Sequence, residues 1–102
     1  LEDESAFRAD LLSVTSWEEA QAPPKVLVVN FSRPLLGQTG SGHFSPVAAV
    51  HVKSDMALVL DTARFKYPPF WAPIPLLWRS LVELDADVGH PRGYLVISRG
   101  AA

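Results

Sequence analysis

The chain has 102 residues, 48% hydrophobic and 20% charged, which predicts one soluble globular unit with a modest core. Its formal net charge of -2 gives no electrostatic reason to expect nucleic acid or an anionic membrane as a partner. No apolar run approaches the ~20 residues of a membrane span, and the lack of cysteine excludes disulfides and thiolate metal ligands within the chain. Because it begins with Leu, we expect a piece of a longer protein.

The first elements expected are a helix and a strand. Apolar residues recur at helical spacing over residues 4–16, with Asp3 or Ser5 as the N-cap. A β-rich apolar run over residues 25–31 predicts a buried strand, and residues 32–41 follow as a loop punctuated by glycine.

A β-hairpin is expected next. Its two strands span about residues 42–52 and 56–60, and the intervening turn of residues 53–55 is short enough to require antiparallel pairing. Pro46 is expected at an edge or a bulge, because proline cannot donate a hydrogen bond to a strand ladder.

The last third predicts a loop, a helix and a strand. Residues 65–73 are rich in aromatic residues and proline and are expected as an ordered loop; Pro75 suits the first turn of a helix ending near Gly89. Residues 92–98 predict the last strand. The whole order indicates an α+β fold, a mostly antiparallel sheet with flanking helices. Three tryptophans are expected in the core: Trp17, Trp71 and Trp78.

One histidine and one aspartate lie at the edges of the hairpin's apolar runs. His43 and Asp61 are 18 residues apart, and hairpin pairing brings position 61 within about three residues of the position facing His43. Strand alternation alone leaves open whether the two share a face. A histidine and a carboxylate that meet can act as a base and its orienting group, although polar residues at strand ends can equally be structural. Such a pair still needs a nucleophile.

Three runs surround this pair: Gly42-His-Phe-Ser-Pro46, Asp55-Met-Ala-Leu-Val-Leu-Asp61 and Ala63-Arg-Phe-Lys-Tyr-Pro-Pro69. Together they closely resemble the catalytic domain of phytochelatin synthase, the glutathione γ-glutamylcysteinyltransferase. Residues 92–99 fit the next strand of that family, and the resemblance extends over residues 7–99.

The resemblance implies a papain-like cysteine-protease fold. Residues 1–102 match its sheet half, the C-terminal part of the catalytic domain, with His43 as general base and acid and Asp61 as the orienting carboxylate. The cysteine nucleophile and an oxyanion-hole glutamine would belong to an upstream half. Without a cysteine, this chain alone is expected to be inactive.

The resemblance also implies a reaction and its partners. A γ-glutamylcysteinyl group would pass from glutathione, through a cysteine acyl-enzyme, to a second glutathione, making phytochelatins in heavy-metal detoxification. The expected partners are glutathione, metal-glutathione thiolates and the upstream half of the domain. No intrinsic cofactor is expected; cadmium, zinc and copper ions would enter as glutathione thiolates or activators. The family resemblance further implies a cytoplasmic enzyme.

Four other residues are candidates for substrate binding or its support. Arg64 can grip the α-carboxylate of a γ-glutamyl group with two parallel hydrogen bonds, and Asp85 would hold Arg64 in place. A purely structural Arg64–Asp85 ion pair is an equal alternative. Arg33 is a second candidate for the substrate carboxylate. Tyr67 is a candidate for the donor pocket, although simple loop packing would also explain it.

Two other functions stay open from the residues. Some papain-like relatives only hydrolyse glutathione or its conjugates, and acceptor-site residues that would separate them from a synthase can lie upstream. A non-catalytic module that kept the fold is the other class; a cysteine upstream would favour the enzyme, and its absence would favour the module. A metal site made of His43, His51 and Asp55 is considered and not expected, because His43 and His51 would be ~26 Å apart along an extended strand.

Overall fold

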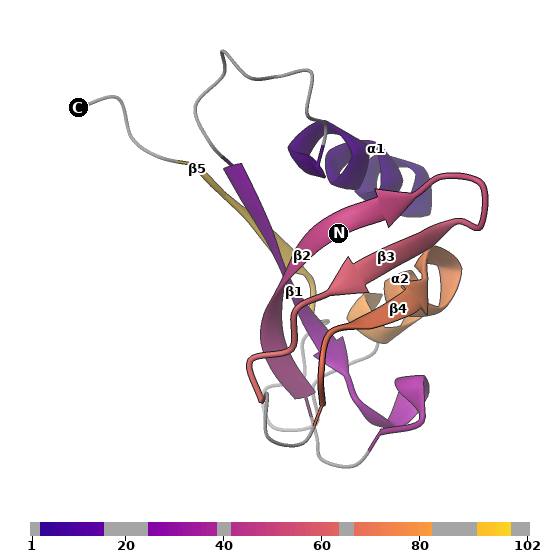
Figure 1. Cartoon of the computed structure of the whole chain (residues 1–102), viewed down its shortest axis with the longest axis vertical. Coiled ribbons are helices and arrows are strands. Elements are labelled where there is room, and N and C mark those ends of the chain that lie inside the picture. Colours follow the sequence, from indigo (N-terminus) through magenta and orange to yellow (C-terminus); the bar gives the residue numbers. More distant parts are fainter. Residues whose placement is uncertain (1–2, 16–24, 39–41, 64–66, 83–91, 99–102) are drawn as a thin grey trace.

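The computed structural model describes residues 3–15, 25–38, 42–63, 67–82 and 92–98. In chain order the elements are α1 (Glu4–Thr15), β1 (Lys25–Ser32), the 3-10 helix η2 (Pro34–Leu36), β2 (Gly42–His51), β3 (Met56–Val59), β4 (Phe70–Pro73), α2 (Ile74–Val82) and β5 (Tyr94–Ser98). The five strands form one sheet in the order β4-β3-β2-β1-β5, with every neighbouring pair antiparallel (Figure 1). The predicted α+β class with an antiparallel sheet is therefore confirmed.

The core lies between one face of the sheet and the two helices. Helix α1 contacts β1 and β2, while α2 contacts β1 and β4 and also touches α1. Burying each large aliphatic side chain contributes roughly 1.5–3 kcal/mol, so this single layer of contacts carries most of the stabilisation. The buried apolar residues are Phe7, Leu11, Leu27, Val29, Phe31, Val47, Ala57, Val59, Ala72, Ile74, Leu77 and Leu81.

Helix α1 begins at a side-chain cap. Of the two expected N-caps, Asp3 is the one used, because its Oδ1 accepts a hydrogen bond from the backbone N–H of Ala6 at 2.7 Å. Phe7 and Leu11 are one turn apart and both are fully buried, so the predicted apolar stripe is the face that contacts the sheet.

Strands β2 and β3 form the expected hairpin, but Pro46 does not lie at an edge. Pro46 belongs to β2, the central strand of the sheet, and pairs with Val28 of β1. It comes just before a register shift between Val47 and Ala49. The position is tolerated because β3 has already ended there, and only the carbonyl of Pro46 is needed, accepting from the N–H of Leu60 at 2.9 Å.

The prediction of a loop over residues 65–73 is wrong for its last part. Phe70–Pro73 forms β4, an edge strand that pairs with Met56–Val59. Aromatic residues favour strands, and Pro73 occupies the final position of an edge strand, where a missing N–H costs little. Edge placement also corrects the prediction for Trp71, whose side chain is 48% exposed rather than in the core.

The other two tryptophans differ. Trp78 of α2 is partly buried and packs against the ring of Phe7, with centroids 5.5 Å apart. Trp17 lies outside the described residues.

Helix α2 has Pro75 in its first turn as expected, and its predicted continuation toward Gly89 also falls outside the described residues. Within the described part of the chain, neither helix has the length and apolar character needed to cross a membrane.

Candidate active site

The candidate site lies where β1 and β3 both end. Each is antiparallel to the strand between them, β2, so the C-terminal ends of β1 and β3 reach the same edge of the sheet as the beginning of β2. Arg33 follows β1, Asp61 follows β3, and His43 is the second residue of β2. The topology therefore brings three residues of the predicted site together where β1 and β3 end and β2 begins.

The chain continues alongside β2 after β3 has ended. The N–H of Leu60 donates to the carbonyl of Pro46 at 2.9 Å, and the hydroxyl of Thr62 donates to the carbonyl of Phe44 at 3.0 Å. The N–H of Thr62 also lies 3.3 Å from the hydroxyl oxygen of buried Ser45. These bonds hold Asp61 beside Ser45.

A bulge in β2 decides which residue of β2 lies opposite Asp61, and therefore which face of the strand Asp61 shares. Val47 pairs with Val59, whereas Ala49 pairs with Leu58, so Ala48 is an extra residue on β2. Beyond this shift the pairing brings position 61 opposite position 45 instead of position 46. Positions 43 and 45 lie on one face of a strand, and diagonal neighbours across an antiparallel pair have their Cα atoms roughly 7–8 Å apart. The backbone register thus places His43 and Asp61 as diagonal neighbours, while the side chain of His43 lies outside the described residues.

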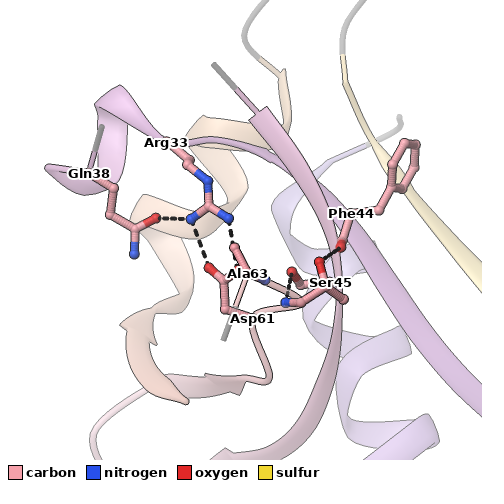
Figure 2. A network of polar contacts seen from close by, with 7 residues as sticks. Arg33, Gln38, Phe44, Ser45, Asp61 and Ala63 are labelled. Carbon is pink, nitrogen blue, oxygen red and sulfur yellow. Dashed lines mark hydrogen bonds and ion pairs between the residues drawn. The ribbon is translucent and has the colours of Figure 1, made fainter. Parts of the chain in front are cut away.

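Asp61 is almost completely buried and bears a charge-paired carboxylate. The residue is 3% exposed, and its two oxygens accept from the guanidinium of Arg33, Oδ2 from Nη1 at 2.7 Å and Oδ1 from Nη2 at 2.8 Å. Oδ1 also accepts from the N–H of Ala63 at 2.8 Å. Figure 2 shows the guanidinium of Arg33 between this carboxylate and the side-chain amide of Gln38.

Arg33 is held from several sides. Its guanidinium carbon lies 5.1 Å from the ring centroid of Phe31 and 4.7 Å from that of Tyr67, both within the range of cation–π attraction. Its Nη1 also donates to Oε1 of Gln38 at 2.8 Å. Such contacts to the guanidinium faces and edges leave it little freedom to turn.

The local backbone explains how Gln38 reaches Arg33. Pro34 starts η2, and Gly37 ends it with φ of 73°, a left-handed conformation that glycine adopts without penalty. The N–H groups of Leu36 and Gln38 then donate to the carbonyl of Arg33 at 3.0 and 2.9 Å. The chain folds back on itself, so that Gln38 faces the side chain of Arg33.

The predicted site residues are thus partly brought together. Asp61, Arg33 and Tyr67 form one contact cluster, next to the strand position of His43. Arg64 and Asp85, and hence the suggested pair between them, lie outside the described residues. Sequence reasoning missed Gln38, and it missed that Arg33 pairs with Asp61. The available signal was topological: with β2 placed between β1 and β3, the residues that follow those two strands must meet.

A hollow lies at the opposite end of the β2–β3 hairpin from the candidate site. It is open and largely apolar, and its lining residues are His51, Ser54, Met56 and Trp71. Nδ1 of His51 is 2.6 Å from the hydroxyl oxygen of Ser54, and the imidazole makes an edge contact with the ring of Trp71. His43 and His51 are at the two ends of β2, and the described residues contain no group of three or more potential metal ligands.

The fold is an antiparallel sheet with helices on one face, and it has a buried carboxylate beside a strand histidine. These features fit the sheet half of a papain-like enzyme domain. The family model described as phytochelatin synthase matches residues 2–94, and the chain therefore belongs to the phytochelatin synthase family. This agrees with the resemblance read from the three sequence runs around His43 and Asp61.

Curated relatives support the same assignment. The chain is 43% identical over 95 residues to glutathione gamma-glutamylcysteinyltransferase 3 of Lotus japonicus, covering 93% of this chain and 19% of the relative. It is 48% identical over 73 residues to glutathione gamma-glutamylcysteinyltransferase 2 of Arabidopsis thaliana, covering 72% and 16%. With the Schizosaccharomyces pombe enzyme it shares 41% identity over 91 residues, covering 89% and 21%. The chain therefore spans about a fifth of the length of these relatives.

Proposed function

We propose that this chain is the sheet half of the catalytic domain of a glutathione γ-glutamylcysteinyltransferase that makes phytochelatins. Family membership and relatives that bear this enzyme name support the proposal. The observation that carries the chemistry is the buried carboxylate of Asp61, diagonal to the strand position of His43. A carboxylate so placed can orient an imidazole and stabilise its protonated form.

The proposed reaction has two acyl transfers. A cysteine thiolate from the upstream half attacks the carbonyl carbon of the Cys–Gly bond of glutathione, the C–N bond breaks, and His43 gives its proton to the departing glycine. The α-amine of a second glutathione then attacks the thioester and loses a proton to His43, while the thiolate leaves. Asp61 keeps the imidazole in the tautomer that both proton transfers require.

Binding of the substrate involves residues nearby. In the proposal Arg64 holds the α-carboxylate of the γ-glutamyl group, as only a planar two-pronged cation can do well. Tyr67, whose ring packs on Arg33, lines the donor pocket. Cadmium and other soft metals arrive as glutathione thiolates, which makes metal-glutathione complexes substrates and ties the enzyme to heavy-metal detoxification in the cytoplasm.

The test uses the full-length protein with glutathione and cadmium, with release of glycine and chain growth of γ-Glu-Cys peptides followed by mass spectrometry. His43→Ala is expected to abolish both, because base and leaving-group acid are lost together. His51→Ala is the matched control, since this exposed histidine lies at the other end of the same strand. Glycine release without peptide growth would replace the synthase proposal by hydrolysis. Full activity of His43→Ala would overturn the catalytic assignment altogether.

A further inference from the structure

The guanidinium of Arg33 donates hydrogen bonds to groups of the protein through both of its terminal nitrogens. Both terminal nitrogens donate to Asp61, and Nη1 donates to Gln38 as well. The Arg33 side chain is 5% exposed and that of Asp61 is 0% exposed. Arg33 was a candidate for the carboxylate of the substrate, but in this arrangement its fork already grips a carboxylate of the protein.

The contacts fix the plane of the carboxylate as well as its position. A bidentate arginine–carboxylate pair is nearly planar, so that rotation of either group breaks a hydrogen bond. The rings of Phe31 and Tyr67 lie close to the guanidinium, and Gln38 holds one of its edges. The N–H of Ala63 holds Oδ1 of Asp61 from the backbone side. These contacts oppose rotation of the Asp61 carboxylate.

Arg33 also balances the charge of Asp61. A carboxylate with no exposed surface and no cation beside it would take up a proton rather than stay ionised. A neutral Asp61 would stabilise an imidazolium poorly, and a freely turning one would orient the ring poorly. The pairing with Arg33 favours both properties that the proposed reaction needs from Asp61, its charge and its orientation.

We propose that Arg33 is a positioning residue, which acts on the reaction through Asp61 and not by binding glutathione. The inference rests on the proposed function, since it assigns Arg33 a part in the same proton transfers. Gln38, Phe31 and Tyr67 then serve to hold Arg33, and Tyr67 influences the reaction through this contact in addition to any contact with substrate.

The two roles of Arg33 predict different kinetics. A residue that acts through Asp61 changes the rate of the chemical steps, whereas a residue that binds the carboxylate of glutathione changes the apparent affinity. Lysine keeps the positive charge but cannot reproduce the two-pronged grip. Arg33→Lys therefore separates loss of orientation from loss of charge.

The experiment measures kcat and KM for glutathione in the full-length protein, with thermal melts recorded beside them. Arg33→Lys is expected to lower kcat about tenfold or more while KM stays within about threefold. The matched control is Arg8→Lys, because Arg8 also bonds both oxygens of an aspartate, through Nε and Nη2 to Asp55 at the far end of the hairpin. The kinetics of this control should equal those of wild type. A tenfold rise in KM with unchanged kcat would overturn the inference in favour of substrate binding.

A double-substitution cycle gives the second readout. If Arg33 acts through Asp61, then Arg33→Met combined with Asp61→Asn is expected to be as slow as Asp61→Asn alone, within about threefold. Rate losses that multiply would show that Arg33 acts independently and would overturn the inference. Should Arg33→Lys fail to fold, this comparison decides, because the double variant removes both buried charges together. A wild-type protein that releases no glycine would defeat the proposed function itself, whereas a wild-type level of kcat in folded Arg33→Lys would defeat only the inference.

Discussion

Within the residues that the structure describes, two arginine–aspartate pairs can be compared, one buried and one exposed. Arg33 and Asp61 are buried, with side-chain exposures of 5% and 0%, while Arg8 and Asp55 are 30% and 43% exposed. Both are bidentate: Arg8 reaches the two Asp55 oxygens at 2.9 and 2.7 Å, and Arg33 reaches those of Asp61 at 2.8 and 2.7 Å. Arg8 uses Nε and Nη2, whereas Arg33 uses Nη1 and Nη2. The bond lengths do not distinguish the two pairs, but burial does.

The exposed pair joins parts of the scaffold. Arg8 on α1 also bonds to Glu4 one turn earlier, and Asp55 closes the β2–β3 turn with φ of 55°. The carbonyl of Asp55 accepts from the N–H of Ile74 at the start of α2. This pair connects α1 with the hairpin turn and, through the Asp55 backbone, with α2. Both of its charged groups are partly exposed to solvent.

The buried pair is costly to keep. Removing two ions from water costs several kcal/mol each, a cost that their mutual attraction roughly offsets, so a buried pair adds little net stability over apolar residues of equal size. Stability alone therefore gives weak reason to keep Arg33 and Asp61, whereas a role in orienting His43 gives a stronger one. The comparison can be tested in three ways, beginning with the largest expected effect.

Neutralising the aspartate should distinguish the pairs by free energy of unfolding. Asp61→Asn leaves the Arg33 charge buried and uncompensated, and is expected to destabilise the full-length protein by about 3–5 kcal/mol. Asp55→Asn removes an exposed partner and keeps a residue that tolerates positive φ, so about 0.2–1 kcal/mol is expected. Denaturant unfolding of the two variants checks this. Equal losses would mean that burial is not what separates the pairs.

The pH dependence of stability should reveal the exposed pair. Hydrogen bonds from Arg8 lower the pKa of Asp55 below its ordinary value of 3.8. A carboxyl whose folded pKa is depressed stabilises the fold above its unfolded pKa, and the contribution disappears as pH falls through the folded pKa.

The measurement is the difference in unfolding free energy between wild type and Asp55→Asn. It is expected to stay constant from neutral pH to about pH 5 and to shrink below about pH 4. Arg8, whose pKa the same bonds raise, remains charged throughout and contributes no change. A difference that grew on acidification would contradict the depressed pKa.

Salt should produce the smallest effect. The screening length falls from roughly 14 Å at 0.05 M salt to about 3 Å at 1 M, and exposed pairs are screened far more than buried ones. The cost of Asp55→Asn is expected to fall by about half over this range, while the cost of Asp61→Asn stays nearly constant. Parallel denaturant titrations at the two salt concentrations measure both costs.

Local patterns predicted the elements well where one apolar stripe or run decided them. The buried pair Phe7 and Leu11, the hairpin over β2 and β3, and the strand after Gly93 all follow from spacing and turn residues. The prediction for Phe70–Pro73 was wrong because the aromatic and proline residues of this segment suit a loop equally well. Only pairing with β3, a contact outside the local sequence, makes it a strand.

For the candidate site, too, the sequence predicted one part and the strand pairing decided the other. The residue types and the family runs around His43 and Asp61 pointed to histidine and carboxylate chemistry before any geometry was considered. Their relative placement depended on the bulge at Ala48, which alternation along the strand cannot reveal. A single extra residue changes which strand position faces Asp61, and nothing in the local residue pattern specifies its place.

By itself the sequence determined the class of the fold, the family and the two residues that carry the proposed chemistry. Tertiary structure alone decided which arginine Asp61 pairs with. Arg33 and Asp61 are 28 residues apart, and they meet only because β1 and β3 end at one edge of the sheet on either side of β2. Strand order follows from long-range packing of the whole core, and for that reason a reading of local patterns did not pair Arg33 with Asp61.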